Sequence, residues 1–211
     1  MPTNYDKMLA SAQELFLTHD QEGMIRRWAL EHDGDYLYAD YMSQPLRIDR
    51  RTGAVSHARE PLPGEYRAAG FVNEGMVLFD LLTHSPTRPH PAGRWSSIST
   101  LGGIIGAGHD RTLSHESTAA KFQDRCEALA QACRRLNGVP AGRGDVSYAI
   151  PVFRDFHILF QFWDGDDEFP ANIKYLFDEN ALQYMHYETL WYVMSNLAER
   201  LEFYANQAAD R

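Results

Sequence analysis

The chain is predicted to fold as a single α+β domain, residues 1–211, with a mainly antiparallel sheet and long amphipathic helices packed on it, including a C-terminal helix. Several segments repeat apolar residues at helical spacing, whereas the last third alternates apolar and polar residues at strand spacing. No internal repeat, low-complexity tract or linker divides the 211 residues. With 44% hydrophobic residues, the chain has enough apolar side chains to bury a sizeable core.

The first part of the chain mixes short helices with short strands. Apolar residues at helical spacing predict the helices, and Gly-containing turns bound the strands. We expect helices over residues 5–19, 24–30 and 65–83, strands over 36–38 and 46–48 and at Val55, a turn at 51–53 and a loop at 61–64.

The middle of the chain, residues 85–111, is rich in Pro and Gly and has no clear period, which predicts a long ordered loop. Its glycine run at 102–108 lacks the surrounding strand, turn and helix that a dinucleotide-binding loop requires. Four histidines lie in or beside this region, and their spacing fits no compact zinc motif. They are His84, His90, His109 and His115.

A strong amphipathic helix is predicted to follow, capped by Ser114 and ended by Asn137-Gly138. Cys126 and Cys133 lie on its apolar stripe. Two turns of helix separate them by roughly 10 Å. That distance is too long for a disulfide, so both thiols are expected to pack as small apolar groups.

The C-terminal third has the clearest patterns. Alternation predicts strands over residues 146–150, 156–162 and 169–177, and the acidic run 164–168 reads as a hairpin loop between the last two. A long helix is then predicted from Leu182 to Tyr204. These strands follow one another closely, which favours antiparallel pairing.

Charge and composition exclude several classes of function. Acidic residues exceed basic ones, 29 against 20, and the net charge is −9. This excess disfavours a nucleic-acid-binding surface and docking on an anionic membrane. The sequence shows no signal peptide, no run of roughly 18–20 apolar residues and only two cysteines. We expect a cytoplasmic protein without a disulfide scaffold.

The acidic hairpin is the first candidate site. Asp164, Asp166, Asp167 and Glu168 place four carboxylates within five residues. Oxygen ligands of this kind suit a hard cation such as Mg²⁺ or Ca²⁺, although the spacing is not that of an EF-hand. The alternative is a solvated hairpin tip whose charges prevent edge-to-edge strand pairing.

The second candidate site lies on the C-terminal helix. A helical projection places His186 with the core-facing stripe, where a histidine is either a hydrogen-bonded structural residue or a ligand or base. Tyr184, Tyr187 and Trp191 make the same helix unusually aromatic. Core packing, an aromatic ligand-binding wall and an interface all remain open for these side chains.

The last third also resembles a known family. The segments that carry the resemblance include the run from Phe162 to Pro170 (FWDGDDEFP), Leu176-Phe177-Asp178, and 184–191. The chain is identified on them as a member of the uncharacterised bacterial and archaeal family called domain of unknown function 3786.

The resemblance implies a setting for the protein. Family members occur mostly in anaerobes, and some join this domain to an iron–sulfur-cluster module or lie near corrinoid methyl-transfer systems. This chain departs from the fused relatives, because it has no cysteine-rich cluster segment. The family supplies no catalytic residue, but its pattern draws attention to Asp166, Glu168 and Asp178.

We therefore expect an accessory or binding module that serves a protein partner carrying an iron–sulfur cluster or a corrinoid. One alternative is a divalent-metal-dependent enzyme that uses the acidic loop, with His186 or Asp178 nearby. The other is a tetrapyrrole- or corrinoid-binding protein with Tyr184, Tyr187 and Trp191 as a flat wall and His186 as axial ligand. The residues by themselves assign no catalytic group and no cofactor.

Overall fold

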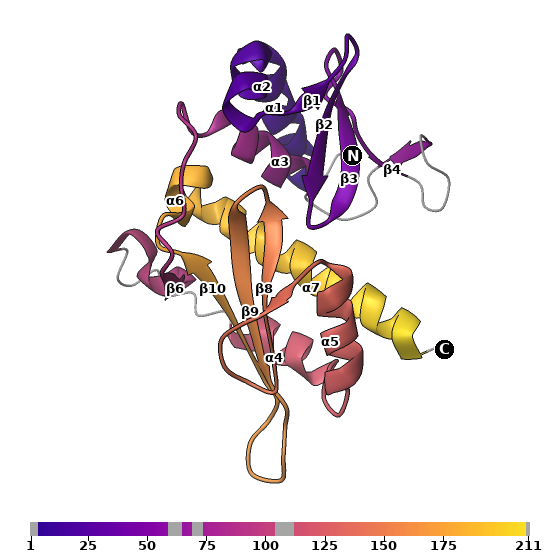
Figure 1. Cartoon of the computed structure of the whole chain (residues 1–211), viewed down its shortest axis with the longest axis vertical. Coiled ribbons are helices and arrows are strands. Elements are labelled where there is room, and N and C mark those ends of the chain that lie inside the picture. The colour runs from indigo at the N-terminus through magenta and orange to yellow at the C-terminus, as the bar shows by residue number, and fades with distance from the viewer. Residues whose placement is uncertain (1–3, 59–64, 69–73, 104–111, 210–211) are drawn as a thin grey trace. The chain divides into compact units, whose positions relative to one another are not determined.

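The computed structural model describes residues 4–58, 65–68, 74–103 and 112–209 (Figure 1). The chain forms two compact units. The first unit comprises Met1–His90 and Gln183–Asn196, and the second comprises Pro91–Leu182 and Leu197–Arg211. Each unit contains helices and a five-stranded antiparallel sheet, so the predicted α+β class is confirmed. One domain over 1–211 stays a prediction.

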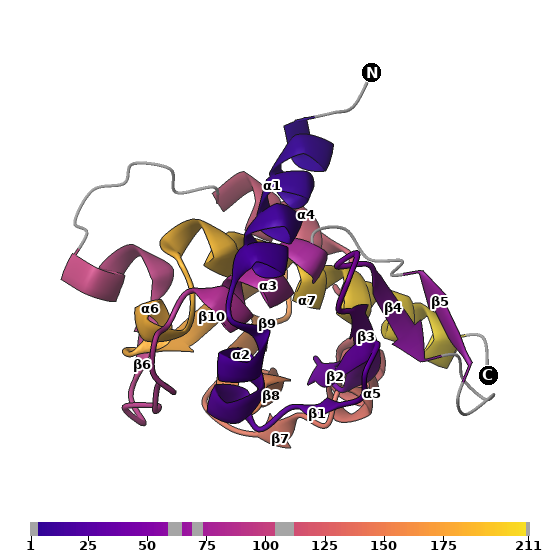
Figure 2. The ribbon, with the colours of Figure 1, turned by 90° about the horizontal axis from the view of Figure 1, so that it is seen from above.

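The sheet of the first unit is a simple meander in which each strand pairs with the next (Figure 2). Its strands are β1 (Glu31–His32), β2 (Tyr36–Tyr41), β3 (Gln44–Asp49), β4 (Val55–Ala58) and β5 (Tyr66–Ala68). The predicted turn at 51–53 is confirmed, because Asp49 Oδ1 accepts the amide hydrogens of Arg51 and Thr52 and Gly53 has φ 68°.

Three helices complete the N-terminal part of the first unit: α1 (Asn4–Thr18), α2 (Gln21–Trp28) and α3 (Glu74–Thr83). Asp20 caps α2 by accepting the amide hydrogen of Gly23. α1 packs against α3 through Phe16 and Phe79, whose ring centroids lie 5.1 Å apart. At the start of α3, Glu74 pairs with His57 of β4, and both side chains are buried.

The prediction of one helix over 65–83 is wrong in its first part. Tyr66–Ala68 is a strand, because it pairs antiparallel with Ser56–Ala58 at the edge of the sheet. Helical spacing of apolar residues is confirmed only from Glu74 onward. The loop predicted at 61–64 lies outside the described residues.

The sheet of the second unit has the order β6-β10-β9-β8-β7, and all its neighbours are antiparallel. Its strands are β6 (Trp95–Ser97), β7 (Val139–Pro140), β8 (Val146–Phe153), β9 (Phe156–Trp163) and β10 (Asn172–Asp178). The three predicted strands correspond to β8, β9 and β10, and the acidic loop joins β9 to β10 as expected (Figure 1).

The middle of the chain is more structured than a loop. Within the predicted loop 85–111 lie β6 and the 3-10 helix η1 (Ile98–Gly103), while 104–111 lie outside the described residues. The helix predicted from Ser114 is two helices, α4 (Thr112–Ala120) and α5 (Cys126–Arg135). It breaks at Asp124, which has φ 59° and whose amide donates to Asp164 Oδ1 instead of continuing a helix.

The C-terminal helix is also broken, so the prediction of one helix from Leu182 is wrong. The chain forms α6 (Ala181–Tyr184) and then α7 (Tyr187–Ala209), separated by Met185 and His186. Residues of α7 up to Asn196 belong to the first unit, and those from Leu197 belong to the second. Among the described residues, no helix has the length and apolar content needed to cross a membrane.

Candidate metal centre

Two of the four carboxylates in the acidic hairpin, those of Asp164 and Asp166, accept backbone hydrogen bonds. Asp164 Oδ1 accepts the amide hydrogens of Asp124 and Gly165. Asp166 Oδ1 accepts those of Glu168 and Phe169, at 2.8 and 2.7 Å. These bonds from the Phe169 and Glu168 amides favour the ionised carboxylate and lower the pKa of Asp166. The hairpin acids therefore shape the turn.

The hairpin tip is exposed. Asp167 and Glu168 lie at its surface, and Phe169 is 67% exposed. A shallow hollow of about 770 Å³ lies beside it. Its lining includes Trp163, Asp164, Asp166, Phe169 and Lys174. The hollow combines opposite charges with aromatic side chains. Among the described residues, its lining contains no group of three potential metal ligands as close together as a bound ion requires.

Asp178 holds backbone segments of the second unit together. The residue is buried, and its Oδ1 accepts the amide hydrogens of Ala92 and Asn180 at 2.7 and 2.8 Å. Its Oδ2 accepts the amide hydrogen of Gly93 at 2.8 Å. One carboxylate thus connects the segment before β6 to the end of β10.

The three aromatic residues of the predicted wall differ in their burial. Tyr184 is buried and its ring lies 6.1 Å from that of Trp28. Tyr187 and Trp191 are only half-buried. Tyr184 therefore contributes to the core of the first unit rather than to a surface on which a flat cofactor could stack.

His186 does not point into the core, so that prediction is wrong. Its side chain is 64% exposed. The helical projection assumed an unbroken helix, whereas His186 lies in the break and immediately precedes Tyr187, the first residue of α7. At that position the side chain of a residue is directed by local capping contacts and not by the helical period.

Asp80, on α3, holds His186 in place. Asp80 Oδ2 accepts the backbone amide hydrogen of His186 at 2.8 Å and the hydroxyl hydrogen of Thr189 at 2.5 Å. Asp80 Oδ1 lies 2.7 Å from His186 Nδ1. The Asp80 side chain is only 14% exposed. This carboxylate therefore caps α7 from outside and presents its second oxygen to the imidazole.

His84 completes a cluster of three potential metal ligands. It follows α3 directly, and its amide donates to the carbonyl of Asp80, so the two residues lie one helical turn apart on the same face. The ring centroids of His84 and His186 are 4.2 Å apart. Ligand atoms from Asp80, His84 and His186 all lie within 4.8 Å of one another.

This cluster is the one group of three or more such side chains found among the described residues, and all its members belong to the first unit. Two imidazoles and one carboxylate suit Zn²⁺, Fe²⁺, Co²⁺, Ni²⁺ or Cu²⁺ better than Mg²⁺ or Ca²⁺, which prefer oxygen ligands. The Thr189 hydroxyl supplies the kind of outer contact that orients a ligating carboxylate.

His186 and His84 were named separately from the sequence, but they were not connected, and Asp80 was missed. Asp80 and His84 are four residues apart at the end of a predicted helix, a spacing that can place two ligands on one face. This spacing can be read from the sequence alone. The pairing with His186, across more than 100 residues, depends on the tertiary fold.

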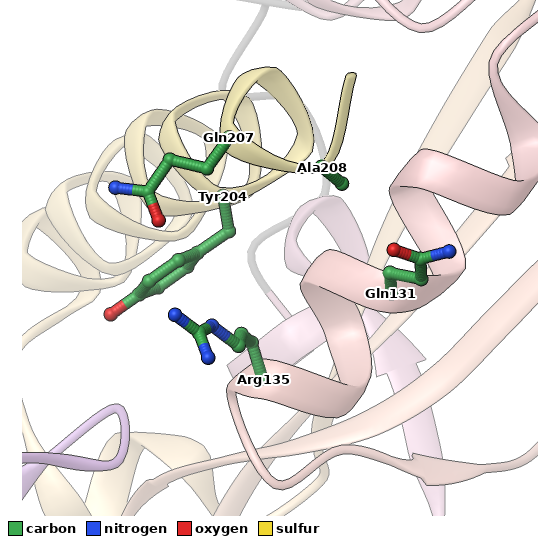
Figure 3. A pocket seen from close by; sticks show the side chains of 5 residues that line it. All are labelled: Gln131, Arg135, Tyr204, Gln207 and Ala208. Atoms are coloured by element: carbon green, nitrogen blue, oxygen red, sulfur yellow. The ribbon is translucent and has the colours of Figure 1, made fainter. Parts of the chain in front are cut away.

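A smaller cavity of about 190 Å³ lies in the second unit between α5 and the end of α7. Figure 3 shows Arg135 reaching from α5 toward the ring of Tyr204, and its guanidinium carbon lies 5.6 Å from the ring centroid. Gln131, Gln207 and Ala208 complete the lining. The lining residues have no carboxylate, thiol or imidazole, the side chains that most often bind metal ions in proteins.

Both cysteines are free thiols, in agreement with the predicted absence of a disulfide. Cys133 is buried, and burial raises its pKa. Burial and the hydrogen bond to Asp164 raise the pKa of Cys126 to about 11. At neutral pH neither thiol supplies an appreciable amount of thiolate, the form that attacks substrates.

The protein is thus an α+β protein with two antiparallel sheets. Its candidate metal site consists of two histidines and one aspartate. The chain belongs to the family described as a domain of unknown function, DUF3786, whose model matches residues 20–200. The comparisons with curated proteins and with solved structures gave no match.

Proposed function

We propose that the protein is a binding module that holds one divalent first-row transition-metal ion at Asp80, His84 and His186. The observation that carries this proposal is the approach of two imidazoles and one carboxylate to within 4.8 Å in the first unit. Zinc is the most suitable ion for a first test, because it binds imidazole and carboxylate ligands without redox chemistry.

The arrangement of hydrogen bonds supports the proposal. The contacts from His186 N–H and Thr189 O–H to Asp80 Oδ2 fix the carboxylate before any ion arrives. Asp80 Oδ1 also lies 2.7 Å from His186 Nδ1 and so orients the imidazole. A bound ion would take a ring nitrogen of His186 that carries no hydrogen, while the other ring nitrogen keeps the proton of the neutral imidazole.

The test is equilibrium dialysis of the whole chain against Zn²⁺, followed by elemental analysis. The wild-type chain is expected to retain one zinc ion. His84→Ala and His186→Ala should each weaken binding at least about 100-fold, because loss of a ligand costs no less than loss of an outer contact. Thr189→Val, which removes only the hydroxyl bond to Asp80, should weaken it about 10-fold.

His32→Ala is the matched control, since His32 is exposed on β1 and lies outside the cluster. It should bind zinc like the wild type. Equal retention of zinc by the wild type and by both ligand variants would contradict the proposal. The predicted partner that carries an iron–sulfur cluster or a corrinoid stays a prediction.

A further inference from the structure

We infer that the ion held by Asp80, His84 and His186 is coordinatively open and takes a small oxygen-donor anion from solvent; this inference rests on the proposed function. The described residues supply three protein ligands. Closed structural zinc sites use four, whereas sites with three protein ligands keep a position for water or substrate. At least one position on the ion therefore belongs to a donor from outside this ligand set.

The cluster reaches the surface of the first unit. Its ligands come from α3, from the residue after α3 and from the residue before α7. Asp80 is the inner ligand at 14% exposure, whereas the His186 side chain is 64% exposed. With His186 exposed to this extent, the cluster is accessible to a small molecule from water.

The net charge of the ion and its protein ligands favours an anion over a neutral ligand at the open position. Two neutral imidazoles and one carboxylate leave a divalent ion with a net charge of about +1. The 23-residue helix α7 begins immediately after His186, so its N-terminal partial positive charge adds to this potential. Glu188, exposed in the first turn of α7, is the acidic group that opposes it. Carboxylate and phosphate oxygens meet these requirements.

The test uses the whole chain loaded with Co²⁺, whose visible absorption bands change when a ligand of the ion changes. Titration with acetate and with inorganic phosphate is compared with titration with acetamide, which has the shape of acetate but no charge. We expect a saturable spectral change with at least one of the anions and none with acetamide. The anion that saturates at the lower concentration identifies the ligand as a carboxylate or a phosphate.

Glu188→Gln provides a second readout that leaves all three ligands in place. Removal of one negative charge from the first turn should tighten anion binding about two- to five-fold. A Co²⁺-loaded chain whose spectrum responds to neither anion, or responds equally to acetamide, overturns the inference and leaves the proposed function standing. A wild-type chain that binds no Co²⁺ overturns both.

Discussion

Zinc at about 100 times its dissociation constant is expected to raise the free energy of unfolding of the first unit by about 2.7 kcal/mol, because the ion binds the folded unit and not the unfolded chain. Only folding brings His186 to Asp80 and His84, which lie more than 100 residues earlier in the sequence.

Urea unfolding in zinc and in a chelator measures this increment. His84→Ala should reduce it below about 1 kcal/mol, since a 100-fold weaker site is only about half occupied at the same zinc concentration. The control His32→Ala should keep it in full. If zinc stabilises His84→Ala as much as the wild type, it binds at a site other than this cluster.

Alanine in place of Asp178 is expected to lower the free energy of unfolding of the second unit by about 2–4 kcal/mol. Three backbone amides, those of Ala92, Gly93 and Asn180, lose a charged acceptor together. Water can reach part of this segment, because Gly93 is exposed, and for this reason the effect is smaller than the sum of three fully buried losses.

Glu179→Gln is the matched control for Asp178. Glu179 is the neighbouring acid, but its contact with Arg94 lies at the surface and should contribute less than about 1 kcal/mol. Both variants are compared by urea unfolding in the presence of a chelator. Equal midpoints for the two variants would mean that Asp178 does not hold the segment before β6.

Local patterns predicted the elements that are stabilised locally. Alternation identified β8, β9 and β10 because every second residue along much of each strand is buried, while residues between them are more exposed in β8 and β10. The turn before Gly53 was predictable, since a short run of Asp, Thr and Gly determines it. The end of α5 at Arg135 was predictable for the same reason, because Asn137, two residues beyond, adopts φ 55°.

Long-range contacts account for the elements that the sequence predicted incorrectly. The C-terminal helix breaks before Tyr187 because the amide and ring of His186 bind Asp80, a residue of a different helix. The helix after Ala120 breaks where the amide of Asp124 binds Asp164. A helical projection contains no information on such partners, so it placed His186 in the core.

The candidate sites, too, were predictable from the sequence only where local spacing determines them. The acidic hairpin suggested cation ligands, but a composition cannot reveal that Asp164 and Asp166 accept backbone amide hydrogens. The spacing of Asp80 and His84 was visible in the sequence and indicated one helix face. Only the fold adds His186, and with it a reason to consider a metal.

X-ray absorption spectroscopy of the zinc-loaded wild-type chain tests the central claim most directly. The account predicts a first shell of nitrogen and oxygen at about 2.0–2.2 Å with the outer-shell scattering of two imidazoles. One imidazole should be lost in His84→Ala and one in His186→Ala. A shell of oxygen ligands without imidazole would place the ion at carboxylates elsewhere, such as those of the acidic hairpin, and would contradict the account.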